Sequence, residues 1–142
     1  EQRRDIGRLA DMIAAAREVA SGRVDLDTVT FDFGAFDVSP EQFSRLERIA
    51  HVMQRILDRH PDEVFLIEGH TDAVGSEFDN LSLSDRRAEA VAQVLTDIFK
   101  IPPENLVTQG YGEQFLKVHT QEAERANRRV AVRRITPLMS RR

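Results

Sequence analysis

The sequence predicts an α/β fold, more specifically an α+β sandwich in which helices pack on one face of a mixed β-sheet. Two long segments carry apolar residues at three- and four-residue steps, the spacing of an amphipathic helix. Four short segments have the alternating or apolar patterns of strands. The order is strand, helix, strand, helix, strand, strand, and strands joined through a helix are expected to be parallel. A chain of 142 residues, 41% of them hydrophobic, can bury such a core.

The first strand and the first helix have clear boundary signals. Residues Val29–Phe33 alternate apolar and polar side chains, which is typical of a strand with one buried face. The helix is expected to start at Ser39 as N-cap, with Pro40 in its first turn and Gln42 closing a capping box. It should end just before Pro61, since proline disfavours helical geometry in the preceding residue. The inward residues of the two elements are Val29, Phe31, Phe33, Phe43, Leu46, Ile49, Ala50, Met53, Ile56 and Leu57.

The second strand and the second helix repeat this arrangement. The apolar run Glu63–Gly69 is bounded by a proline and a glycine, which favours a buried strand. The helix is predicted over Ser82–Lys100, with Ser82 as N-cap and Asp85 completing a capping box. Two consecutive prolines, Pro102 and Pro103, stop it. Its inward side is expected to hold Leu83, Val91, Val94, Leu95 and Ile98.

The remaining strands are predicted at Leu106–Gly112 and Arg129–Ile135. A further helix is expected over residues 3–20, where a thin, alanine-rich apolar stripe could pack on the domain, dimerise with a partner helix, or end a longer linker. The chain is therefore divided into an N-terminal helix and linker at 1–27, a folded domain at 28–136 and a tail at 137–142.

Composition restricts the function classes. A net charge of -4 offers no basic field for nucleic acid. With no cysteine, the chain cannot form disulfides or thiolate metal sites. No apolar run reaches the roughly 20 residues that span a bilayer. The chain begins with Glu1 instead of methionine, so we expect a processed or excised piece, and any membrane attachment would come through a missing N-terminal region.

The most informative motif is the corner between the second strand and the second helix. Asp72 follows the strand, and Arg87 is expected in the first turns of the helix, so that an anion and a cation face each other. Gly69 and Gly75 permit a tight loop between them. A fixed carboxylate beside a fixed guanidinium suits a ligand that carries both an ammonium and a carboxylate group. Such a pair favours a recognition site over machinery for breaking bonds.

Three motifs together make the chain resemble the OmpA-like C-terminal peptidoglycan-binding domain, which OmpA, Pal and MotB proteins share. They are Gly69, His70, Thr71 and Asp72, then Asn80, Leu83, Ser84, Arg87 and Ala88, and finally Asn127, Arg128, Arg129 and Val130. The resemblance implies that Asp72 and Arg87 hold the diaminopimelate of the stem peptide. It also implies that Thr71 and Asn80, on loop positions, shape the pocket and that Arg128 brings another basic group to it.

The resemblance further implies a non-enzymatic module that needs no cofactor and no metal. Such a module would bind peptidoglycan and anchor its parent protein to the cell wall, in the periplasm and attached to the outer membrane or envelope of a Gram-negative bacterium. Two alternatives stay open from the residues themselves. One is a metal-assisted cell-wall hydrolase using His70 and Asp72 with Glu68, and the other is a structural module that oligomerises through the helix at 3–20.

Overall fold

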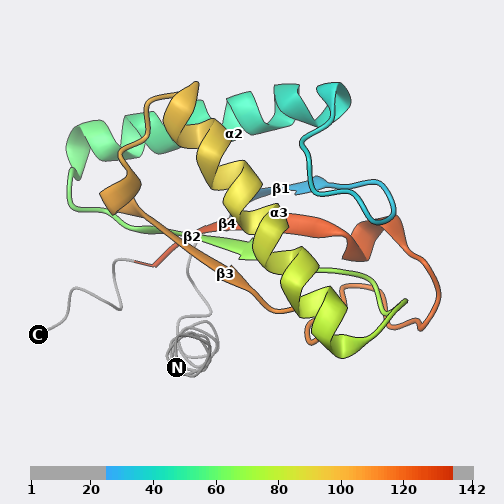
Figure 1. Ribbon diagram of the computed structural model, residues 1–142. Coiled ribbons are helices and arrows are strands. Elements are labelled where there is room, and N and C mark those ends of the chain that lie inside the picture. Colours follow the sequence, from blue (N-terminus) through green and yellow to red (C-terminus); the bar gives the residue numbers. More distant parts are fainter. Residues whose placement is uncertain (1–24, 136–142) are drawn as a thin grey trace, which may run out of the picture.

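The computed structural model describes residues 25–135, and Figure 1 shows the arrangement of the elements. The helix predicted at 3–20 and the tail at 137–142 lie outside the described residues, and the predicted domain boundaries stay predictions. Within the described range, no helix is both long enough and apolar enough to cross a membrane. The elements are β1 (Asp25–Thr30), α2 (Pro40–Arg59), β2 (Phe65–Gly69), α3 (Glu77–Asp97), η1 (Pro103–Asn105), β3 (Leu106–Gly110), η2 (Arg125–Asn127) and β4 (Arg129–Arg134).

The predicted fold class is confirmed. The four strands form one mixed sheet in the order β1-β4-β2-β3, in which β2 and β3 are parallel and β4 runs antiparallel to both of its neighbours. Both helices lie on the same face of the sheet (Figure 1). The main core fills the space between these layers and contains Val29, Phe31, Leu46, Ile49, Ala50, Met53, Phe65, Ile67, Ala88, Val91, Leu95, Ile101, Val130 and Val132.

The first strand lies earlier than predicted. It ends at Thr30, and the chain then turns so that the amide of Ala35 donates to the carbonyl of Asp32. Phe31 is buried as expected, but Phe33 is 62% exposed and the prediction that it faces the core was wrong. The alternation of apolar and polar residues continues beyond the end of the strand, into a turn in which Gly34 has a positive φ of 73°. The alternation therefore did not mark where the strand ends.

The first helix begins and ends where predicted, but its capping box is absent. Ser39 occupies the N-cap position, yet its side chain makes no capping hydrogen bond. Gln42 instead accepts a hydrogen bond from the amide of Thr30 through Oε1, at 3.0 Å. This polar side chain therefore ties the start of α2 to the end of β1.

The second helix starts more than one turn earlier than predicted. Its N-cap is Ser76, whose hydroxyl accepts from the amide of Asp79, and not Ser82. Ser82 lies inside the helix, and Asp85 accepts from the amide of Gly110 instead of closing a capping box. The prediction failed because the buried stripe of this part of α3 is polar and shows no hydrophobic period. Of the residues predicted to face inward, Ile98 is 55% exposed.

Two glycines let α3 lie directly on the sheet. Gly69 and Gly110 are neighbours on β2 and β3. A Cβ atom at Gly69 would lie 1.9 Å from the carbonyl oxygen of Ser84, and one at Gly110 would lie 2.4 Å from the Ser84 hydroxyl. Only residues without a side chain allow this contact. It places the middle of α3 against the ends of both strands.

We expect Gly69→Ala to lower the free energy of unfolding by about 2–3 kcal/mol or more, because the helix backbone must move away from the sheet. Urea unfolding measures the change. Gly34→Ala is the matched control, since no atom lies within 4 Å of its added methyl group and only the left-handed backbone costs energy, about 1 kcal/mol. Equal losses in the two variants would contradict the steric explanation.

Candidate functional site

The candidate site lies where three loops meet at one end of the sheet. β1 ends and β4 begins at the paired residues Thr30 and Arg129, and β2 and β3 end at Gly69 and Gly110. The loops at 31–39, 70–76 and 111–128 therefore lie close together, beside the first turns of α3 (Figure 1). The chain thus gathers the motifs that the sequence singled out into one region.

Asp72 is a buried carboxylate with several donors around it. Its Oδ2 accepts from Arg128 Nη1 at 3.0 Å and from the amide of Glu124 at 3.4 Å, and its Oδ1 accepts from the amide of Val74 at 3.2 Å. The residue is 4% exposed. Its direct cationic partner in the described structure is Arg128, and the two side chains form a partly buried ion pair.

Arg87 lies beside this pair and is fully buried. Its guanidinium donates to three backbone carbonyls, those of Ala35 at 2.7 Å, His70 at 3.0 Å and Asp32 at 3.3 Å. Two of these carbonyls belong to the loop after β1 and the third follows β2. Arg87 therefore joins two loops through their main chains, and its own side chain comes from the third turn of α3.

The surroundings of Arg87 have opposite effects on its pKa. Burial and the nearby positive charge of Arg128 lower the pKa of Arg87 to about 10, whereas the carboxylate of Asp72 raises it. The group stays charged at neutral pH. The corner thus holds two guanidinium groups and one buried carboxylate, and Asp72 interacts with both cations.

The resemblance implies a site role for Arg128, and the side chains of Arg128 and of its neighbour Arg129 contact different partners. Arg128 turns to Asp72 and also donates through Nε to the carbonyl of Phe31 at 2.9 Å. Arg129 donates to the carbonyl of Phe115 at 3.0 Å, in the loop between β3 and β4. Of the two, Arg128 is the one that the structure brings to Asp72.

Thr71 and Asn80 hold the backbone of the site. The Thr71 hydroxyl donates to the carbonyl of Asp72 at 2.9 Å, and Asn80 Nδ2 reaches the same oxygen at 3.3 Å. Asn80 also donates to Glu113 Oε1 at 2.7 Å. It lies in the first turn of α3 and not in a loop as predicted. Both side chains are buried and fix the carbonyl of Asp72 from two sides.

A second ion pair, which the sequence interpretation missed, lies next to the first. Arg125 donates through Nη1 to Asp32 Oδ1 at 2.8 Å and through Nε to the Thr30 hydroxyl at 3.2 Å. The Arg125 guanidinium lowers the pKa of Asp32 through this hydrogen bond and its charge. A usable signal was the spacing, since Arg125 precedes Arg128 by three residues; Arg125 begins the short helix η2, and Arg128 follows its last residue.

The residues named for the metal alternative, Glu68, His70 and Asp72, do not share one site in the structure. His70 Nε2 lies 3.2 Å from Glu68 Oε1, and the His70 ring stacks on Tyr111 with centroids 5.6 Å apart. Asp72 is turned to Arg128 instead. Among residues 25–135, no three His, Asp or Glu side chains gather as a metal site would require.

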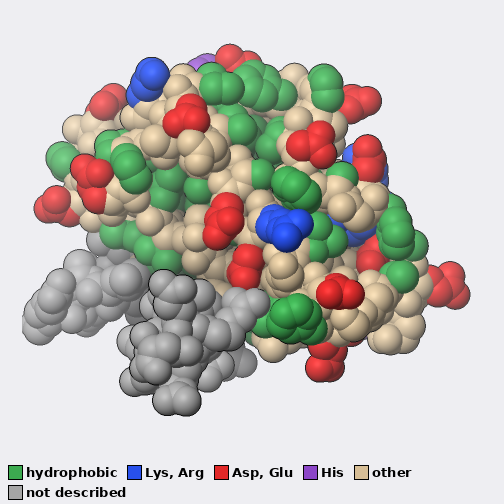
Figure 2. Space-filling view, viewed as in Figure 1, with side chains coloured by type: hydrophobic (Ala, Val, Ile, Leu, Met, Phe, Trp, Pro, Cys, Tyr) green, Lys and Arg blue, Asp and Glu red, His purple; other side chains and the backbone are tan. Residues whose placement is uncertain are grey.

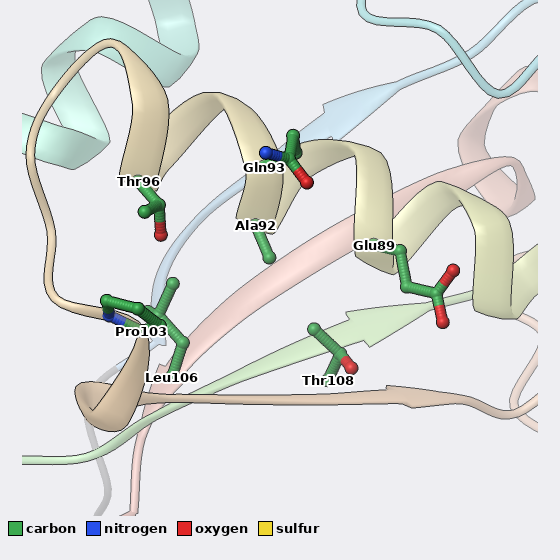
Figure 3. A pocket seen from close by; sticks show the side chains of 7 residues that line it. All are labelled: Glu89, Ala92, Gln93, Thr96, Pro103, Leu106 and Thr108. Carbon is green, nitrogen blue, oxygen red and sulfur yellow. The ribbon is translucent and has the colours of Figure 1, made fainter.

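One groove in the described residues lies apart from this corner. It has a volume of about 490 Å³ and runs between α3 and β3 (Figure 3). None of the predicted site residues lines it. The convergence of charges at Asp72, and not the size of a hollow, identifies the candidate site.

Comparisons with known proteins found similar sequences. The model of the OmpA family matches residues 30–129. Outer membrane porin F of Pseudomonas aeruginosa is 36% identical over 110 residues, which cover 76% of this chain and 30% of that protein. The peptidoglycan-associated lipoprotein of the same organism is 28% identical over 111 residues, covering 77% of this chain and 62% of that protein. The chain thus spans about a third of the porin.

Solved structures show the same fold. The peptidoglycan-associated lipoprotein from Burkholderia pseudomallei superimposes with a TM-score of 0.64 at 28% identity, covering 75% of this chain and 88% of that one. The C-terminal domain of Helicobacter pylori MotB also has a TM-score of 0.64, at 24% identity, with coverage of 75% and 81%. The second likeness concerns the fold alone.

We expect Arg87→Ala to lower the free energy of unfolding by about 3 kcal/mol or more, because it leaves three backbone carbonyls without their charged donor. Urea unfolding measures the loss. The neighbouring Arg86, whose guanidinium lies over the Phe36 ring, is the matched control, and Arg86→Ala should cost no more than about 1 kcal/mol. A loss in Arg87→Ala as small as in the control would refute the structural role.

The Asp32–Arg125 pair predicts a pH effect. The pKa of Asp32 should lie below its ordinary value of 3.8 and should return to it in Arg125→Ala, as followed by NMR titration of the carboxyl group. Because the folded-state pKa is depressed, the pair stabilises the protein above pH 3.8, and this contribution disappears as the pH falls through the folded-state pKa. Arg45→Ala, which removes a partner of Asp27, should leave Asp32 unchanged.

Proposed function

This chain belongs to the OmpA family, and from that premise we propose that it binds peptidoglycan by holding the diaminopimelate residue of the stem peptide at Asp72. The observation that supports the proposal is the meeting of one buried carboxylate with two guanidinium groups, those of Arg87 and Arg128, at the loop end of the sheet. The free end of a diaminopimelate side chain carries one ammonium and one carboxylate, which these charges complement.

Each group of the ligand has a partner in this proposal. The ammonium approaches Asp72, whose Oδ1 accepts a single hydrogen bond among those described, from Val74. The carboxylate approaches Arg128, whose side chain is 12% exposed. Arg87 adds positive charge beside the Asp72–Arg128 pair. Two of its five N–H groups are not used by its three hydrogen bonds to backbone carbonyls. Because Arg87 is fully buried and bonded to the carbonyls of Asp32 and Ala35, it acts on the ligand through its charge.

The supporting side chains would prepare the site before the ligand arrives. Thr71 and Asn80 hold the carbonyl of Asp72, so the carboxylate does not have to be ordered on binding. Two charge-assisted contacts of about 1.5–3 kcal/mol each, less the cost of association, correspond to an affinity between micromolar and millimolar. Weak sites suit a polymer that offers many copies of the same ligand.

The wider role follows from the relatives. Their names are those of outer membrane porins, outer membrane proteins and lipoproteins, one of them peptidoglycan-associated. We place this chain accordingly in the periplasm of a Gram-negative bacterium, as a non-enzymatic module that ties an envelope protein to the cell wall. Membrane attachment would come from a part of the parent protein outside this sequence.

We expect Asp72→Asn to weaken co-sedimentation with isolated sacculi by about tenfold or more, since it removes the charge that meets the ammonium while keeping the shape of the side chain. Free diaminopimelate should displace the wild-type protein. Nα-acetyl-lysine amide, which has the ammonium and no carboxylate, should not.

The matched control is Asp97→Asn, an identical change on the exposed far end of α3. Urea unfolding of each variant separates lost binding from lost folding. Equal sacculus binding by wild type and a folded Asp72→Asn variant would remove Asp72 from the site, and failure of diaminopimelate to compete would remove the ligand assignment.

A further inference from the structure

β3 is an edge strand with a defined set of outward-facing backbone groups. In the described part of the chain it pairs with β2 alone. The amide of Tyr111 donates to the carbonyl of Gly69, so every second residue of β3, counted back from Tyr111, faces β2. The N–H and C=O groups of Leu106, Thr108 and Gly110 therefore face outward. The amide of Gly110 donates to Asp85, and the amide of Leu106 donates to the carbonyl of Pro103. Among the described residues, the open part of the edge is therefore the carbonyl of Leu106 and both backbone groups of Thr108.

A groove lies directly beside this open edge. Its volume is about 490 Å³, and it runs between α3 and β3 (Figure 3). The side chains of Leu106 and Thr108 form its lower wall, and Ala92 and Thr96 on α3 leave room above them (Figure 3). A strand added to β3 would thus find space for the side chains that it turns toward α3.

The lining of the groove carries one charged side chain, and it is acidic. Glu89 lines it, and none of the described residues that line it is Lys or Arg. Asp97 continues the row along α3, where it accepts from Gln93 at 2.6 Å. Acidic side chains are also spread widely over the face of the molecule that carries α3, whereas basic ones are few there (Figure 2). An occupant with basic side chains complements this surface.

We propose that the groove between α3 and β3 binds an extended, lysine- or arginine-containing segment of a partner protein, which adds to the sheet as a fifth strand beside β3. Main-chain hydrogen bonds to Leu106 and Thr108 give the segment its extended form, and alternate side chains enter the groove beneath Glu89. This surface is separate from the Asp72 corner, so a partner protein and the cell wall can be bound at the same time.

The test uses the full chain and a fluorescein-labelled hexapeptide of alternating lysine and valine, followed by anisotropy and by amide NMR spectra. We expect saturable binding, with shifted amide signals along β3 and slowed hydrogen exchange at the amide of Thr108. Thr108→Pro removes one outward N–H group from an edge position where proline is tolerated, and should weaken binding about tenfold. Glu89→Lys, a change on an exposed helix position, should weaken it at low salt by several-fold.

Two controls separate this proposal from peptidoglycan binding. Thr108→Pro should bind sacculi like wild type, and Asp72→Asn should bind the hexapeptide like wild type. An alternating glutamate and valine peptide should not bind. The proposal is overturned if the lysine peptide fails to bind up to about 1 mM, the weak limit of a specific contact. It is equally overturned if both variants bind like wild type or the shifted amides cluster around Asp72.

Discussion

The whole site depends on how closely α3 approaches the sheet. Gly69 and Gly110 are adjacent on two parallel strands, and atoms of Ser84 and Asp85 on α3 occupy the space where their side chains would be. One turn further along the helix, this contact puts the guanidinium of Arg87 beneath the loops that leave β1 and β2. A helix held farther from the sheet, as side chains at these positions would require, could not reach those carbonyls.

The site is organised mainly through the backbone. Arg87 and Arg128 together contact the carbonyls of four residues in the loops, and Thr71 and Asn80 contact a fifth, that of Asp72. Burying a guanidinium is costly unless its N–H groups are satisfied, and these carbonyls satisfy most of them. Because two cations share one buried carboxylate, the corner keeps a surplus of positive charge that an arriving carboxylate can neutralise.

Much of the fold and part of the site could be predicted from the residues. Strong hydrophobic periods and prolines located α2 and gave the order of helices and strands along the chain, and the expectation that Arg128 lies at the site is consistent with its contact with Asp72. The order of the strands within the sheet was not predicted. The start of α3 was missed because Asn80, Ser84 and Arg87, which it buries, are polar and give no apolar period. The pairing of Asp72 with Arg128, across 56 positions of sequence, and the engagement of Arg87 by carbonyls depend on tertiary contacts that no local pattern encodes.

The loop after β1 is held by its main chain, and this has an evolutionary consequence. Arg87 and Arg128 donate hydrogen bonds to the backbone carbonyl oxygens of Phe31, Asp32 and Ala35, and every amino acid has such an oxygen. The side chain of Phe33, by contrast, points into solvent. Exposed positions of this loop such as Phe33 can therefore vary between species while the path of the loop across the domain persists, whereas Phe31, which is buried, and Gly34, which has a positive φ, are more restricted. Exposed side chains beside the site can therefore differ while the backbone hydrogen bonds that hold the loop are kept.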